Sequence, residues 1–109
     1  MKWIPRAAGQ HLRRLLREFP AVLVYGPRQC GKSTLLEACL PGWERVDLER
    51  PADAALLRAD LEGFLAARPR RLALDEAQRL PELFPALRHA LDRGRGMGRY
   101  VLTGSASPA

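Results

Sequence analysis

A glycine-rich loop directly follows a short apolar run in this chain, and this pair constrains the fold more than any other feature. Residues 21–25 are apolar and β-rich, as in a buried parallel strand. Residues 32–40 have the pattern of a helix. The loop between them reads Gly26-Pro27-Arg28-Gln29-Cys30-Gly31-Lys32-Ser33. A strand that passes through such a loop into a helix predicts a phosphate-binding loop in an α/β fold.

The residue types in this loop are those that a phosphate group requires. Gly26 and Gly31 permit backbone angles and a close approach that a Cβ atom would prevent. Backbone NH groups of the loop surround the phosphates, and the helix after Gly31 directs the positive end of its dipole toward the anion. We expect Lys32 to reach the β- and γ-phosphates and Ser33 to ligate Mg²⁺. The loop therefore predicts that the chain binds a nucleoside triphosphate.

Strand and helix patterns alternate along the rest of the chain. Residues 10–19 predict an amphipathic helix, because their apolar side chains recur at i, i+3, i+4 and i+7. We expect further strands at 45–48, 71–75 and 100–105, and further helices at 51–67 and 80–92. Gly63 is the expected point of division in the longest helix. This alternation predicts a parallel sheet with helices on both faces, in which ligands bind at the carboxyl ends of the strands.

Polar residues lie at the carboxyl ends of two of these strands. Asp75 and Glu76 end the third strand, and Thr103 lies near the end of the fourth. Phosphoryl transfer to water needs a metal ion and a group that orients or deprotonates the water. We expect Asp75 to hold Mg²⁺ and Glu76 to polarise the attacking water. Thr103 is the candidate for a polar residue beside the γ-phosphate, and Ser105 and Ser107 are its alternatives.

Three other residues each have two interpretations. Arg28 and Arg79 are close enough in sequence to phosphate ligands to contact phosphate themselves, and otherwise they are solvated. Cys30, beside a helix N-terminus, is either a redox-sensitive thiol or a neutral part of the loop. With Cys39 it forms no metal-ligand spacing, and a disulfide is not expected in a reducing compartment.

Charge and hydropathy limit the class of protein. The net charge is +6, but 16 of the 18 basic residues are arginine and they are scattered along the whole chain. This charge is a weak indication of nucleic-acid contact, and the arginine-rich side of the helix at 10–19 is interpreted as a solvated face. No apolar run approaches the ~18 residues of a membrane span, and the first residues lack the apolar part of a signal peptide. We therefore expect a cytoplasmic protein without membrane contact.

Three segments together resemble one known family. They are residues 26–34, residues 74–84 and residues 102–105. They resemble the AAA-type ATPase family of bacteria and archaea, whose members usually carry a nuclease-like C-terminal domain of unknown function. The resemblance covers nearly all 109 residues, and it implies an AAA-type core that binds ATP and Mg²⁺.

The resemblance also implies a role for individual residues. Lys32 and Ser33 would be Walker A ligands, within a run of nucleotide contacts that extends from Gly26 to Thr34. The Asp75–Glu76 pair would be the Walker B motif, with Ser33 and Asp75 at the metal. Thr103 would occupy the sensor position on a fourth strand that lies between the loop strand and the acidic strand.

The length of the chain differs from that of the family. Residues 1–109 are expected to be the N-terminal part of a P-loop ATPase domain, with four of the five core strands and without the helical lid, the arginine finger and the C-terminal domain. The strand at 21–25 would then be an exposed edge, open to self-association or to pairing with another chain. A missing arginine finger would also impair hydrolysis, since such a residue raises the rate of hydrolysis ~10³- to 10⁵-fold.

Other classes of protein remain as alternatives to a hydrolase. A non-catalytic fragment that binds nucleotide or a partner protein is the main alternative. A small P-loop kinase is disfavoured, because such a kinase does not usually carry Glu76 after the strand aspartate. A GTPase is disfavoured because the chain lacks an Asn-Lys-x-Asp segment for guanine.

Overall fold

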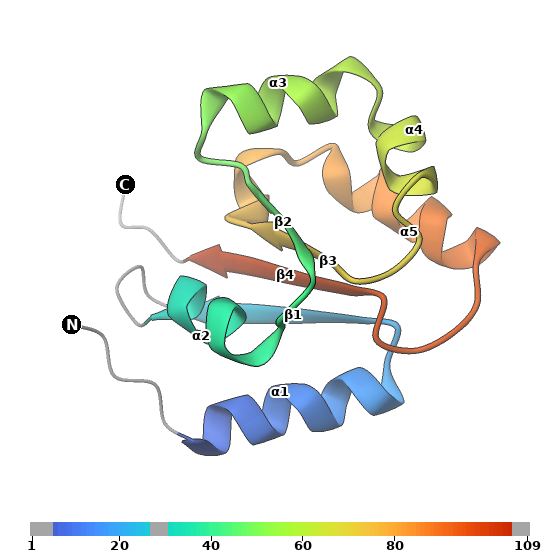
Figure 1. Cartoon of the computed structure of the whole chain (residues 1–109). Coiled ribbons are helices and arrows are strands. Elements are labelled where there is room, and N and C mark those ends of the chain that lie inside the picture. Colours follow the sequence, from blue (N-terminus) through green and yellow to red (C-terminus); the bar gives the residue numbers. More distant parts are fainter. Residues whose placement is uncertain (1–5, 27–30, 106–109) are drawn as a thin grey trace.

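Four parallel strands form one sheet at the centre of the molecule (Figure 1). The computed structural model describes residues 6–26 and 31–105. The strands are β1 (Ala21–Gly26), β2 (Glu44–Asp47), β3 (Leu72–Asp75) and β4 (Tyr100–Ser105). Their order across the sheet is β1-β4-β3-β2, and every pairing is parallel. The predicted α/β fold with a parallel sheet is confirmed, with β4 between the loop strand and the acidic strand.

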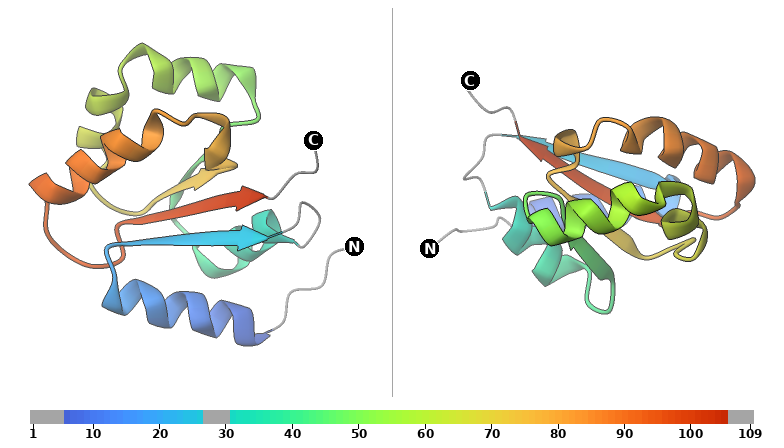
Figure 2. Two further views of the ribbon diagram at one scale, coloured as in Figure 1. Left: turned by 180° about the vertical axis from the view of Figure 1, so that it is seen from behind. Right: turned by 90° about the horizontal axis from the view of Figure 1, so that it is seen from above.

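Helices cover both faces of the sheet (Figure 2). One face packs against α1 (Arg6–Glu18) and α2 (Lys32–Cys39). The other packs against α3 (Pro51–Ala59), α4 (Leu61–Ala66), the short 3₁₀ helix η1 (Ala77–Arg79) and α5 (Leu83–Arg93). The two layers of helices therefore enclose two apolar cores, one on each side of the strands.

The central strands β3 and β4 are buried along their whole length. Side chains alternate between the two faces of a strand, so both faces of a central strand need apolar residues. Leu72 and Leu74 of β3 belong to the core under α3–α5, whereas Ala73 between them belongs to the core under α1 and α2. This double burial explains why the sequence of β3 is a continuous apolar run that ends at Asp75.

The expected helix at 51–67 is divided, but at Asp60 and not at Gly63. Asp60 has an extended φ of −161° and is the N-cap of α4, where its Oδ1 accepts a hydrogen bond from the backbone N of Gly63 at 3.1 Å. Aspartate is a favoured N-cap residue because its side chain satisfies an otherwise unpaired NH group. A Cβ atom at Gly63 would lie 2.1 Å from Asp60 Oδ2. The glycine therefore leaves room for the cap and does not itself break the helix.

Strand β1 is one edge of the described sheet, as expected from the sequence. Leu23 is 53% exposed and Tyr25 is 63% exposed. Self-association through this edge stays a prediction. Arg13, Arg14 and Arg17 are exposed on α1, and contact with nucleic acid likewise stays a prediction. No helix in the described part of the chain has the length and apolar character needed to cross a membrane.

The parallel register brings the polar strand ends together on one side of the sheet. Asp47 is paired with Asp75, and Gly26 is paired with Ser105. Since β4 lies between β1 and β3, the end of the predicted phosphate-binding strand and the end of the acidic strand are separated by only one strand. The fold thus places residues from distant parts of the sequence around one edge.

Leu74 provides a test of this core. It is fully buried in the centre of the sheet, so Leu74→Ala should lower the free energy of unfolding by about 2–5 kcal/mol. Leu56→Ala, at an exposed position of α3, should change it by less than about 0.5 kcal/mol. Urea denaturation followed by circular dichroism measures both values. Similar losses in the two variants would contradict the described packing.

Candidate functional site

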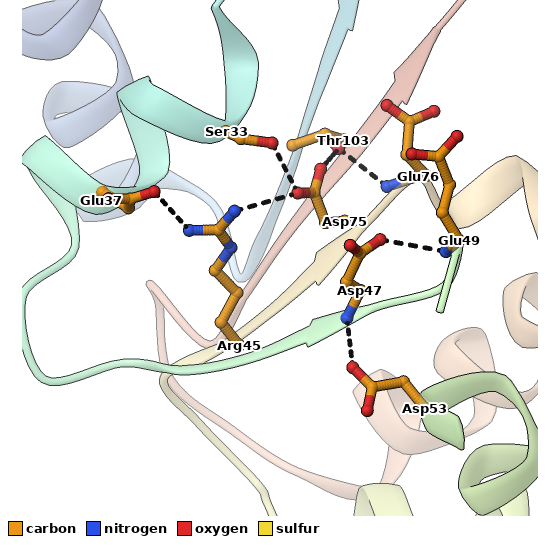
Figure 3. Close-up of polar contacts among 9 residues, drawn as sticks. All are labelled: Ser33, Glu37, Arg45, Asp47, Glu49, Asp53, Asp75, Glu76 and Thr103. Atoms are coloured by element: carbon orange, nitrogen blue, oxygen red, sulfur yellow. Dashed lines mark hydrogen bonds and ion pairs between the residues drawn. The ribbon is translucent and has the colours of Figure 1, made fainter. Parts of the chain in front are cut away.

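Asp75 is the centre of a polar cluster at the carboxyl end of the sheet (Figure 3). Its side chain is almost entirely buried, with 3% of the residue exposed. Oδ2 accepts hydrogen bonds from Ser33 Oγ at 2.8 Å and from Arg45 Nη2 at 3.3 Å. Oδ1 accepts a hydrogen bond from the hydroxyl of Thr103. A buried carboxylate needs such partners, because an uncompensated charge in the interior is costly.

The two described ends of the glycine-rich loop are joined by Lys32. This lysine is buried, with 6% exposed, and its Nζ donates a hydrogen bond to the carbonyl oxygen of Gly26 at 3.1 Å. Gly31 precedes α2 with a φ of 86°, in the left-handed region that favours glycine. Pro27, Arg28, Gln29 and Cys30, which the sequence analysis includes among the nucleotide contacts, lie outside the described residues. The arrangement of Gly26, Gly31 and Lys32 supports the predicted loop at its two ends.

Thr103 lies deeper in the sheet than expected. It is completely buried, since β4 continues for two more residues and the register pairs Thr103 with Val24 inside β1. Its Oγ1 donates to Asp75 and accepts a hydrogen bond from the backbone N of Glu76 at 2.9 Å. Thr103 therefore connects the two acidic residues from inside β4, and its place beside the γ-phosphate stays a prediction.

Glu76 adopts an uncommon backbone conformation directly after β3. Its φ of 57° and ψ of 51° lie in the left-handed region, which costs a non-glycine residue of order 1–3 kcal/mol. Such strain persists only where the surroundings determine the conformation. Here the hydrogen bond from its NH group to Thr103 and the 3₁₀ helix η1 that follows fix the turn.

The Glu76 side chain is held by Ser105 and Gln78. Ser105 Oγ donates to Glu76 Oε1 at 2.7 Å, and Gln78 Nε2 donates to the same oxygen at 2.7 Å. Ser105 is the last residue of β4 and is one of the two alternatives to Thr103 from the sequence, while Ser107 lies outside the described residues. Ser105, at the tip of β4, therefore contacts the Glu76 side chain directly.

Sequence reasoning missed Arg45 and Gln78. Arg45, on β2, forms ion pairs with Glu37 at 3.2 Å and with Asp75 at 3.3 Å (Figure 3). The only signal for it was a basic residue on the strand that would pair with β3. Arg79 was considered as a phosphate ligand, but in this structure its Nη2 contacts Glu49 Oε2 at 3.0 Å.

The residues present fit a magnesium ion that is shared with phosphate groups. Ser33 Oγ and Asp75 Oδ2 are potential oxygen ligands for a metal ion and lie 2.8 Å apart. Mg²⁺ usually takes one or two protein ligands and completes its shell with water and substrate phosphates. Among the described residues no group of three or more His, Cys, Asp or Glu side chains could hold a metal.

The fold and this site are those of the class of P-loop proteins. A family model described as "AAA domain" matches residues 18–109, and the chain belongs to this AAA family of P-loop ATPases. Its members are nucleotide-binding, ATPase-like proteins that typically use ATP and Mg²⁺. The family expected from the three sequence segments is thereby confirmed.

Two mycobacterial relatives align with most of this chain. Uncharacterized proteins Rv2008c of Mycobacterium tuberculosis and Mb2031c of Mycobacterium bovis are each 40% identical over 111 residues, which cover 94% of this chain. The chain spans about a quarter, 24%, of the length of these curated relatives.

Thr103 offers a test of the polar cluster. Thr103→Val keeps the shape but leaves the Asp75 carboxylate and the Glu76 NH group each short of a partner, so the free energy of unfolding should fall by about 1–3 kcal/mol. Thr103→Ser retains the hydroxyl and should lose only the ~0.8 kcal/mol of one methyl group. Chemical denaturation compares the two. Equal stability of the valine variant and the wild type would contradict the cluster.

Proposed function

We propose that this chain binds Mg-ATP at the carboxyl end of its sheet, and that the site hydrolyses ATP in the full-length protein. One observation carries the proposal. Ser33, at the start of α2, donates a hydrogen bond to Asp75 at the end of β3, 42 residues further along the chain. These are the hydroxyl and the carboxylate that the Walker A and Walker B motifs would supply to one magnesium ion.

Each described residue of the site has a role in binding under this proposal. Lys32 is buried and its Nζ donates to the carbonyl oxygen of Gly26, at the start of the loop, and its ammonium group would bind phosphate oxygens when nucleotide is present. Gly31 and Thr34, at the start of α2, would present backbone NH groups to the phosphates. When bound, Mg²⁺ neutralises negative charge on the phosphate oxygens. Ser33 and Asp75 would hold the ion.

Hydrolysis requires a base, and Glu76 is the candidate. The water oxygen forms a bond to the γ-phosphorus while the bond from that phosphorus to the bridging oxygen of ADP breaks. The proton that the water loses passes to the Glu76 carboxylate, which gives ADP and inorganic phosphate as products. Thr103 supports this role as a positioning residue, because it fixes the Glu76 backbone against Asp75.

A second candidate function is attachment of another strand at β1. Leu23 and Tyr25 expose apolar side chains on this edge strand. Exposed apolar edges are templates for strand addition. The non-catalytic alternative combines such strand pairing with nucleotide binding that leads to no hydrolysis. It predicts equal rates of ATP hydrolysis for the wild type and for Glu76→Gln.

Two substitutions separate binding from hydrolysis. Lys32→Ala removes a charge-assisted contact worth about 1.5–3 kcal/mol, so the affinity for Mg-ATP should fall about ten- to a hundredfold. Glu76→Gln should bind Mg-ATP as the wild type does but lose ~10²- to 10⁴-fold in the rate of hydrolysis. Isothermal titration calorimetry and phosphate release measure the two quantities.

The matched control is Arg88→Ala, which removes an exposed cation on α5. It should change neither the affinity nor the rate. Unchanged affinity in Lys32→Ala would contradict the proposed nucleotide site. Equal rates in the wild type and Glu76→Gln would contradict hydrolysis while leaving binding intact.

A further inference from the structure

Gln78 lies beside the candidate base without having a place in the proposed reaction. Its side-chain Nε2 is 2.7 Å from Glu76 Oε1 and 3.3 Å from Ser105 Oγ. Ser105 Oγ in turn donates to the same Glu76 oxygen at 2.7 Å. The three side chains therefore form a closed triangle of hydrogen bonds, with Glu76 as the acceptor of two of them.

The chemistry of the three groups fixes the orientation of the Gln78 amide. An ionised carboxylate only accepts hydrogen bonds, so the atom that faces it must be the NH₂ group and not the amide oxygen. The reversed amide would place two acceptors against each other. The Gln78 amide oxygen, Oε1, is buried and accepts no hydrogen bond from the described residues. Since a buried unpaired acceptor carries a free-energy cost, its presence indicates that the contact with Glu76 determines the orientation.

Both hydrogen bonds reach the same carboxylate oxygen. Glu76 Oε1 accepts from Ser105 and from Gln78, whereas Oε2 accepts no hydrogen bond within the described part of the chain. One oxygen is thus anchored while the other keeps its full capacity to accept a proton or to bind water. A carboxylate held at one oxygen has a defined direction for the other, which is the requirement for an oriented base.

A glycine at position 104 leaves space beside the Gln78 amide. A Cβ atom at Gly104 would lie 3.3 Å from Gln78 Oε1 and 3.1 Å from Tyr25 Cδ1. Such contacts are tighter than ordinary van der Waals distances, so an alanine would push on both neighbours. Gly104 thereby leaves the Gln78 amide and the Tyr25 ring undisturbed.

We propose that Gln78 is the positioning residue of Glu76, which it holds through Oε1 together with Ser105 so that Oε2 is directed to the attacking water. This inference rests on the proposed hydrolysis. It adds a residue outside the Walker pair and assigns the two carboxylate oxygens of Glu76 different tasks.

The kinetic test uses Gln78→Met in the full-length protein. Methionine has nearly the same shape but no amide, so Glu76 loses one of its two donors. The rate of ATP hydrolysis should fall about ten- to a hundredfold, since a displacement of ~1 Å can cost ~10²-fold. The affinity for Mg-ATP should not change. Gln10→Met, at an exposed glutamine on α1, is the matched control and should keep the wild-type rate.

A double substitution tests whether Gln78 acts through Glu76. In a Glu76→Gln background the base is already absent, so adding Gln78→Met should cause no further loss. A full further loss would overturn the inference, as would a wild-type rate in Gln78→Met alone. A fall in nucleotide affinity equal to the fall in rate would assign Gln78 to binding or stability and would also overturn it.

A second readout does not depend on turnover. In NMR spectra of the ¹⁵N-labelled protein, the side-chain NH₂ signals of Gln78 should shift in Glu76→Ala and in Ser105→Ala, and should stay unchanged in Arg88→Ala. Unchanged signals in the first two variants would overturn the contact. A wild type that hydrolyses ATP no faster than Glu76→Gln contradicts the proposed function and this role together, whereas a fully active Gln78→Met contradicts this role alone.

Discussion

The buried carboxylate of Asp75 is the interaction on which the site depends. Its two oxygens accept hydrogen bonds from α2, β2 and β4, so three separate parts of the chain meet at one side chain. Charge on this carboxylate is tolerated in the interior because Arg45 and two hydroxyl groups surround it. The Arg45 guanidinium lies 3.3 Å from Oδ2, so a positive charge already lies beside the carboxylate that would hold a magnesium ion under the proposed function.

The strand order connects the Asp75 cluster to the candidate base, Glu76. Because β4 lies between β1 and β3, residues of β4 contact both the acidic strand and the loop strand. Thr103 and Ser105 lie on β4 two residues apart. The first fixes the backbone of Glu76 and the second its side chain. A single strand thus holds the candidate base at two points, and Gln78 provides a third.

The sequence predicted the features that depend on local pattern. The approximate positions of the four strands and the acidic residue at the end of β3 follow from periodicity and from the chemistry of the residues themselves. Arg45 and the depth of Thr103 depend instead on which residues oppose one another across strands, and the place of Gln78 depends on how η1 packs against β4. A shift of register by one residue reverses the face of every side chain, and no local pattern fixes that register. The division of the helix at Asp60 was missed for a different reason, since a capping aspartate was given less weight than a glycine.

The most direct test of the central claim uses Mn²⁺ in place of Mg²⁺ with ATP. Mn²⁺ is paramagnetic and broadens the NMR signals of nearby backbone amides. If the site lies around Asp75, the signals of Ser33, Asp75 and Thr103 should broaden strongly on addition of Mn-ATP, and that of Arg88 on α5 should broaden much less. Broadening that is absent, or that is as strong at Arg88 as at Asp75, would contradict a nucleotide site at the carboxyl end of this sheet.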